Sequence, residues 1–333
     1  MHRRVRPYTL EDIPPSIMSG TAQQKSEPQK SDPAKEGIGA FLNPAEMHKL
    51  GRLLLLSRNK IEGNLAGAHR SPLRGPSSEF ADHKSYGTGD ETKHIDWRVF
   101  ARTDKYFIKR YEDETNLRVY LVLDGSASMN YSSDGLCTKF RFACRLAAAI
   151  GYVIVKARDS IGLFLQGQKE GARMHPGNSF QHLNNLLKQA QSHEPEGSSD
   201  LASVLHEIAS SVRRGALVVL LSDLLGNEEE IIKGLAHLRK QRHDVIVFQT
   251  LDTAELDLSL TKPCEAQDLE TGEALPINPR GLAEEYQQVF GEFLDHYKKA
   301  CAGMNIDYRV VATNQELESF VRVYLSERRR LTR

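Results

Sequence analysis

The chain has 333 residues, which favours one large domain or two smaller ones. Lysine plus arginine and aspartate plus glutamate both total 44, and this balance argues against nucleic acid as a partner. The four cysteines have no metal-binding spacing, which indicates a reducing, cytoplasmic compartment. No stretch approaches the roughly 20 apolar residues that span a bilayer, so we expect no membrane insertion.

The N-terminal third is low in apolar periodicity. Residues 19–38 are rich in Gln, Lys, Ser and Pro, and we predict a disordered tail over residues 1–42. A helix is predicted to start after Asn43, which can cap it, because Pro44 suits a first helical turn. Glycine, serine and proline then punctuate short strand-like pieces. We therefore predict an added segment over residues 43–115, made of a helix, loops and short strands.

A different pattern runs over residues 116–330, where continuous Val/Ile/Leu strands alternate with helices. This alternation predicts an α/β domain whose helices flank both faces of a mostly parallel sheet. An insertion at residues 255–280 is expected to form a hairpin, with a partner-binding surface as the alternative. Such an open sheet binds ligands beyond the carboxyl ends of its strands, where the strand order switches.

Polar side chains follow two of the predicted strands. Asp124 ends the first and is followed by Ser126 and Ser128, Asp223 ends a later one, and Ser199 precedes a helix. Carboxylates and hydroxyls are ligands that a hard cation such as Mg²⁺ accepts while it keeps several waters. The pattern predicts a metal site in which two carboxylates balance the charge of the ion. One position would stay open to an outside carboxylate.

Other interpretations of these residues remain open. Serine and aspartate also form turns and cap helices, and we interpret Asp200 mainly as such a cap. A phosphatase or hydrolase could use Asp124 as a nucleophile, although Ser126 stands where a second aspartate would be the general acid. A serine hydrolase would need a G-x-S-x-G turn, which the chain lacks here. Upstream, His83 and His94 lie near aspartates, but their spacing matches no zinc rule.

The stretch "DGSASM" resembles the D-x-S-x-S signature of von Willebrand factor A domains, which carry a metal-ion-dependent adhesion site. The resemblance implies that Asp124, Ser126 and Ser128 bind the ion directly. It places Ser199 where a threonine is usual, and Asp223 as a ligand that binds directly or through water. The implied ion is Mg²⁺, with Mn²⁺ or Ca²⁺ as alternatives.

The segment before this strand resembles the signature of the bacterial domain-of-unknown-function 58 family. Lys93 stands where that family usually has arginine. We interpret Asp96, Trp97 and Arg102 as a hydrogen-bonded and stacked module that braces the added segment against the sheet. The residues that match are Tyr86, Gly89, Asp90, Ile95, Asp96, Trp97, Ala101 and Arg102.

The family resemblance also implies a partner, because members are often encoded beside MoxR-type AAA+ ATPases. The hypothesis is a non-enzymatic adaptor or co-chaperone that works with such an ATPase in complex assembly or maturation. An acidic side chain of the ATPase, or of its client, would complete the metal site.

Overall fold

The computed structural model describes residues 36–51, 79–87, 95–112 and 117–331, apart from 134, 136, 168–170, 199, 258–263, 268, 270–273 and 278. Its contacts divide the chain into two units. One comprises Met1–Asn59 with Leu117–Arg333, and the other comprises Lys60–Asn116.

The smaller unit is built on two antiparallel strands, β1 (Glu79–Ser85) and β2 (Phe107–Glu112). A short helix, α3 (Trp97–Thr103), lies between them in the chain. Asp96 caps this helix, since its Oδ1 accepts a hydrogen bond from the backbone N–H of Arg98 at 3.0 Å. The predicted short strands are present in this segment.

The larger unit is organised around a six-stranded sheet in the order β10-β7-β6-β3-β4-β5. All neighbouring strands are parallel except β5, which runs antiparallel to β4. The predicted mostly parallel sheet is therefore confirmed, while the edge strand β5 was not predicted. The strands are β3 (Arg118–Asp124), β4 (Ser160–Gln166), β5 (Ala172–Gly177), β6 (Leu217–Ser222), β7 (Asp244–Leu251) and β10 (Asp307–Ala312).

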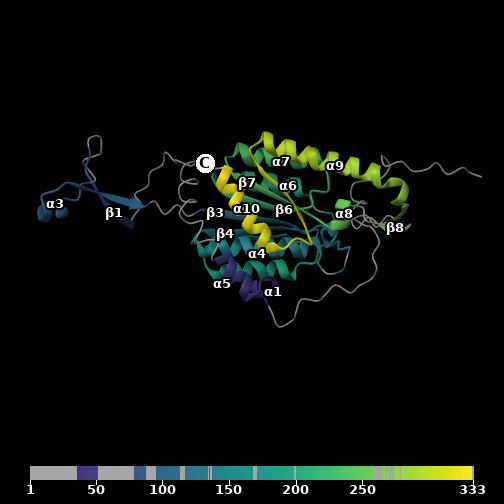
Figure 1. The fold of residues 1–333 in the computed structure, drawn as a ribbon, viewed down its shortest axis with the longest axis horizontal. Coiled ribbons are helices and arrows are strands. Elements are labelled where there is room, and N and C mark those ends of the chain that lie inside the picture. The colour runs from purple at the N-terminus through teal and green to yellow at the C-terminus, as the bar shows by residue number, and fades with distance from the viewer. Residues whose placement is uncertain are drawn as a thin grey trace, which may run out of the picture. The chain divides into compact units, whose positions relative to one another are not determined.

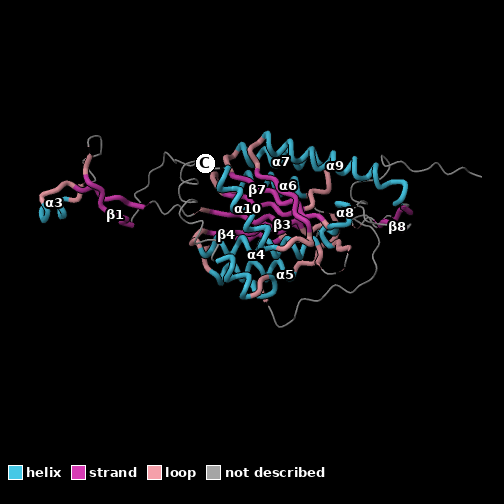
Figure 2. Tube along the Cα trace, in the orientation of Figure 1, coloured by secondary structure: helices cyan, strands magenta, loops and turns pink. Residues whose placement is uncertain are grey.

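Helices cover both faces of this sheet, as Figures 1 and 2 show. Leu121 of β3 packs in a core with α4, α5 and α10, whereas Val122 faces a second core formed with α6, α7 and α9. Because both faces are covered, β6 is buried at every position and reads as an unbroken apolar run. The helices are α4 (Lys139–Lys156), α5 (Phe180–Ser192), α6 (Leu201–Ser211), α7 (Glu228–Lys240), α9 (Pro279–Gly303) and α10 (Leu317–Leu331).

The start of the described chain belongs to this larger unit. A short helix α1 (Ile38–Phe41) leads to a helix over residues 44–51, and Phe41 and Leu42 are buried in or against the core. The prediction of disorder was therefore wrong for residues 38–42. Asn43 and Glu46 form the expected cap, each accepting a hydrogen bond of 2.8 Å from the backbone N–H of the other. Residues 1–35 of the predicted tail, and the predicted helix beyond residue 51, lie outside the described residues.

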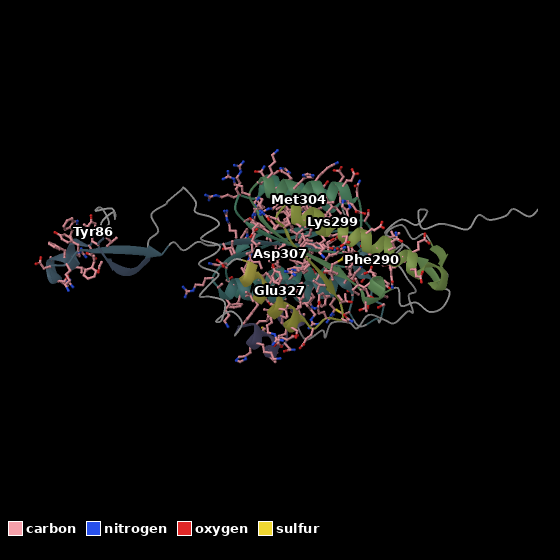
Figure 3. The ribbon with its side chains drawn as sticks, turned by 45° about the horizontal axis from the view of Figure 1, so that its top comes forward. Tyr86, Phe290, Lys299, Met304, Asp307 and Glu327 are labelled. Atoms are coloured by element: carbon pink, nitrogen blue, oxygen red, sulfur yellow. The ribbon has the colours of Figure 1, made fainter. Side chains whose placement is uncertain are left out.

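The C-terminal part completes the larger unit. A short helix α8 (Thr253–Asp257) precedes an antiparallel pair, β8 (Cys264–Gln267) and β9 (Ala274–Ile277), which confirms the predicted hairpin. The helix α10 is held on β10 by polar contacts. Tyr324 donates a 2.8 Å hydrogen bond to Asp307, and Arg309 forms a 3.0 Å ion pair with Glu327. Figure 3 labels Asp307 and Glu327. Among the helices of the described residues, we find none with the length and apolar character to cross a membrane.

Candidate metal centre

The candidate site begins at the carboxyl end of β3, the strand from which the sheet extends in two directions. Residues Val119 to Leu123 pair with β6 on one side, and β4 lies on the other. This is the switch in strand order at which doubly wound sheets bind ligands. The hydroxyl of Ser222, at the end of β6, donates a 2.6 Å hydrogen bond to Oδ2 of Asp124. The ends of the two strands are therefore joined at the site.

The turn after β3 gathers three oxygen-bearing side chains. Oδ1 of Asp124 accepts a 3.0 Å hydrogen bond from the backbone N–H of Ser126, which fixes the carboxylate against the turn. Ser126 and Ser128 flank the start of a short 3-10 helix, η4 (Ala127–Asn130), and their Oγ atoms lie 3.0 Å apart. All three side chains are buried. The two hydroxyls thus lie on one side of the turn.

A loop before α6 lies against this turn. The backbone N–H of Ala127 donates a 2.8 Å hydrogen bond to the carbonyl of Gly197. A Cβ at Gly125 would lie only 2.2 Å from Nε2 of His193. Both contacts come from residues 193–197, so this loop packs directly on the candidate site.

The predicted ligand Ser199 lies outside the described residues. Its neighbour Asp200 is the N-cap of α6, as expected: it accepts hydrogen bonds from the backbone N–H and the hydroxyl of Ser203. These bonds hold the pKa of Asp200 below its usual range.

Asp223 lies at the end of β6 as predicted, but its charge is compensated by a lysine. Its Oδ2 accepts a 2.8 Å hydrogen bond from Nζ of Lys139, and its Oδ1 accepts one of 3.1 Å from the backbone N–H of Leu225. We expected two carboxylates to balance the charge of a bound ion. That expectation was wrong in this respect, because Lys139 neutralises one of the two.

Lys139 also binds a third acidic group. Its Nζ lies 2.7 Å from Oε1 of Glu255 on α8, and all three side chains of this cluster are almost fully inaccessible to solvent. Burial acts to lower the pKa of Lys139, but the carboxylates of Asp223 and Glu255 outweigh it and hold that pKa above its ordinary value. Burial raises the pKa of Glu255 to about 7, although Lys139 opposes this. The cluster thus places one buried cation between two buried acids.

The oxygen geometry of the turn fits a small hard cation. Neighbouring ligands of an octahedral Mg²⁺ ion, each about 2.1 Å from the metal, lie about 3.0 Å apart. The Oγ atoms of Ser126 and Ser128 have this separation. Both oxygens of Asp124 accept hydrogen bonds, Oδ1 from the backbone N–H of Ser126 and Oδ2 from the hydroxyl of Ser222, and these bonds fix the carboxylate at the turn. Within the described part of the chain, no three side chains of His, Cys, Asp or Glu form a metal-binding group, so the hydroxyls are essential to any such site.

The motif residues of the smaller unit have a different role. Asp96 caps α3, and Trp97 packs edge-on against Phe100 with ring centroids 6.1 Å apart. Tyr86 contacts Tyr106, while Arg102 is exposed in the last turn of α3. The hydrogen bonding of Asp96 and the ring packing of Trp97 are present, whereas the part predicted for Arg102 and the bracing against the sheet stay predictions. Gly89 and Asp90 lie outside the described residues.

Sequence reasoning missed Lys139, Ser222 and Glu255. One signal was available for Lys139, since it shares a helical face with Phe142, Ala143 and Leu146, all of them buried. A lysine on the apolar face of a helix needs a buried acidic partner.

An open, doubly wound α/β sheet with an Asp-x-Ser-x-Ser turn at its switch point defines a protein of the von Willebrand factor A-like class. The family model described as "Protein of unknown function DUF58" matches residues 82–291. The chain therefore belongs to the DUF58 family, and the family resemblance of its sequence is confirmed.

Similar proteins include uncharacterized protein Rv1480 of Mycobacterium tuberculosis and uncharacterized protein Mb1516 of Mycobacterium bovis. Each is 28% identical over 239 residues, which is 70% of this chain and 74% of the relative. Among solved structures, BatB from Bacteroides thetaiotaomicron has a TM-score of 0.38 at 14% identity, covering 63% of this chain and 98% of that one. The SpRpn10 VWA domain also has a TM-score of 0.38, at 9% identity, covering 62% and 94%. Because these scores are low, the fold class rests on strand order and site position.

Proposed function

We propose that this protein is a non-enzymatic binding module that holds a partner protein through a divalent cation at Asp124, Ser126 and Ser128. The observation that carries the proposal is the 3.0 Å separation of the two serine hydroxyls beside a buried carboxylate, at the switch point of the sheet. In the structure the two hydroxyls share a hydrogen bond. The placement beside Asp124 at the ligand-binding edge favours the ion.

Each residue of the turn has a defined part in the proposed site. Asp124 supplies the anionic ligand, and its orientation is fixed by the backbone N–H of Ser126 and by the hydroxyl of Ser222. Ser126 and Ser128 supply neutral ligands. When bound, Mg²⁺ would supply a positive charge for a partner's aspartate or glutamate. Asp223 enters the proposal through water or as a nearby charge, because the ammonium group of Lys139 compensates its charge and would repel a directly bound cation.

The charge balance supports a site that would still attract another anion after the ion is bound. Lys139 neutralises one acid, so Asp124 is the carboxylate left to face the ion directly. A divalent ion with one direct carboxylate retains a net positive charge and attracts an acidic side chain from outside. As partner we propose a MoxR-type AAA+ ATPase or its client, in the cytoplasm, as the family resemblance suggests.

The experiment that tests the metal site is calorimetric titration of Mg²⁺ and Mn²⁺ into the full chain, with the melting temperature followed in parallel. The variants are Asp124→Asn and Ser128→Ala, which change the donor set with little change in volume. Asp159→Asn is the matched control, because Asp159 is half-buried and precedes β4 at the opposite edge of the sheet. We expect saturable binding in wild type and control, and at least about tenfold weaker binding in both site variants. Equal binding in all four proteins contradicts the site.

A second arm separates docking from catalysis. Binding of the ATPase should require Mg²⁺, vanish with chelator and weaken in Asp124→Asn. The alternative, a hydrolase or phosphatase with Asp124 as nucleophile, predicts turnover of a general phosphoester such as p-nitrophenyl phosphate, lost in Asp124→Asn while metal binding remains. That result would replace the docking proposal.

A further inference from the structure

A second group of metal-binding side chains lies between two helices on one face of the sheet. Helices α6 and α7 lie side by side (Figure 1). They approach closely at Gly234 of α7, where an added Cβ would lie 2.8 Å from Cβ of Leu205. A glycine at this position lets the two backbones come together, so side chains next to the crossing are forced into contact.

His206 and His237 form that contact. His206 follows Leu205 directly, and His237 lies three residues after Gly234. Their Nδ1 atoms are 2.9 Å apart, and their ring centroids are separated by 5.2 Å with planes inclined at 46°. Both side chains are half-buried, so the pair is held by packing and still reaches solvent.

The pair has a simple hydrogen-bonded state, in which one Nδ1 carries a proton and the other accepts it. The same two atoms, both unprotonated, form a bidentate nitrogen site. The two Nδ1 atoms are 2.9 Å apart. If one metal ion bound both at about 2.0–2.1 Å, the nitrogen–metal–nitrogen angle would be about 90°. This is the angle between adjacent ligands in octahedral or square-planar geometry, whereas two corners of a zinc tetrahedron would need about 3.4 Å.

We propose that His206 and His237 bind a first-row transition cation through their Nδ1 atoms, with Ni²⁺ and Cu²⁺ favoured by the geometry. Among the described residues, no third His, Cys, Asp or Glu completes a group with them, so water fills the other positions. The site is independent of the one at Asp124. Imidazole nitrogens select transition metals, and carboxylate and hydroxyl oxygens select Mg²⁺.

Occupancy of this site has a structural consequence. A cation bound to both histidines links α6 to α7, and any ligand that binds only the folded state raises its stability. The melting temperature is therefore a readout that is separate from any activity.

The test is calorimetric titration of Ni²⁺, and then Cu²⁺, into the untagged full chain. The variants are His206→Gln and His237→Gln. The controls are His175→Gln, an exposed histidine on β5, and His2→Gln, which removes a competing ligand beside the amino terminus. We expect binding of one ion in wild type and both controls, a rise in melting temperature with Ni²⁺, and affinity lower by about tenfold or more in each pair variant.

Two results overturn the proposal. One is the absence of saturable Ni²⁺ and Cu²⁺ binding in wild type, and the other is binding of equal affinity in the pair variants. If a glutamine variant fails to fold, electron paramagnetic resonance of Cu²⁺ bound to the His2→Gln protein decides the question. Coupling to two imidazole nitrogens supports the pair, and coupling to one or none refutes it.

Discussion

Lys139 and Asp223 form a wholly buried ion pair, with Nζ and Oδ2 2.8 Å apart, at the base of the candidate metal site. Lys139 is the first residue of α4 and Asp223 follows β6, so the pair ties the start of α4 to the end of a central strand. Glu255 joins the same ammonium group from α8. A single cation thus connects three elements around the site.

Substitution of Lys139 by methionine should destabilise the fold strongly. The change keeps much of the side-chain volume but leaves Asp223 and Glu255 buried without their cation. Breaking a buried ion pair on one side costs about 3–5 kcal/mol. Urea unfolding at neutral pH measures the loss. Lys233→Met is the matched control, because its ion pair with Glu230 is exposed to solvent and should contribute little to stability. Equal losses in the two variants would contradict this account.

The Lys139→Met variant should also bind Mg²⁺ more tightly than wild type. Lys139 repels a cation at the site and neutralises Asp223, and both effects end in Lys139→Met. Removing a nearby positive charge lessens the electrostatic repulsion of a divalent ion, and we expect affinity to rise by about tenfold or more. Calorimetry below the melting temperature of the variant measures the change, with Lys233→Met again as control. Unchanged affinity would mean that Asp223 takes no part in metal binding.

The raised pKa of Asp159 should lower the free energy of unfolding as the pH rises from about 4 to about 6. It precedes β4, its Oδ1 accepts a 3.0 Å hydrogen bond from the backbone N–H of Leu117, and burial raises its pKa to about 6. The unfolded chain loses this proton near pH 3.9, so the folded state holds more protons in this window and stability falls with pH. Asp159→Asn keeps the acceptor without the charge. Its stability relative to wild type should therefore be greater at pH 7 than at pH 4, as measured by urea unfolding. A difference that does not change with pH would show that the carboxyl titrates normally.

The sequence predicted those parts of the site that are local in the chain. Asp124, Ser126 and Ser128 lie within five residues, and the alternation of strand and turn places their side chains on one side. The partners of Lys139 are 84 and 116 residues away, and no short pattern records such a contact. Only the position of Lys139 on an apolar helical face indicated that a buried acid had to exist.

For the fold, too, the elements with a clear local pattern were predicted and the others were not. The buried strands β3 and β6 read as apolar runs, and the long helices show clear periodicity. The edge strand β5 does not, because it alternates between half-buried and exposed residues and contains Pro176. Proline is tolerated at a sheet edge, where one side of the strand forms no ladder, and such a strand lacks the signal of a central one.

Two glycine-to-alanine substitutions should change stability in opposite directions. At Gly125 the new Cβ would lie 2.3 Å from the backbone oxygen of Gln166, which cannot move without disturbing β4, and 2.2 Å from the ring of His193. Overpacking of this kind costs about 1–3 kcal/mol. At Gly291, inside α9, no atom lies within 4 Å of the new Cβ. Alanine there reduces the freedom of the unfolded chain and should stabilise the fold by about 0.4–1 kcal/mol.

Urea unfolding of the Gly125→Ala and Gly291→Ala variants beside wild type measures both effects. Because Gly125 lies between Asp124 and Ser126, Gly125→Ala should also weaken Mg²⁺ binding, and Gly291→Ala should leave it unchanged. A Gly125→Ala protein as stable as wild type would show that the loop at residues 193–197 does not pack on the turn as described.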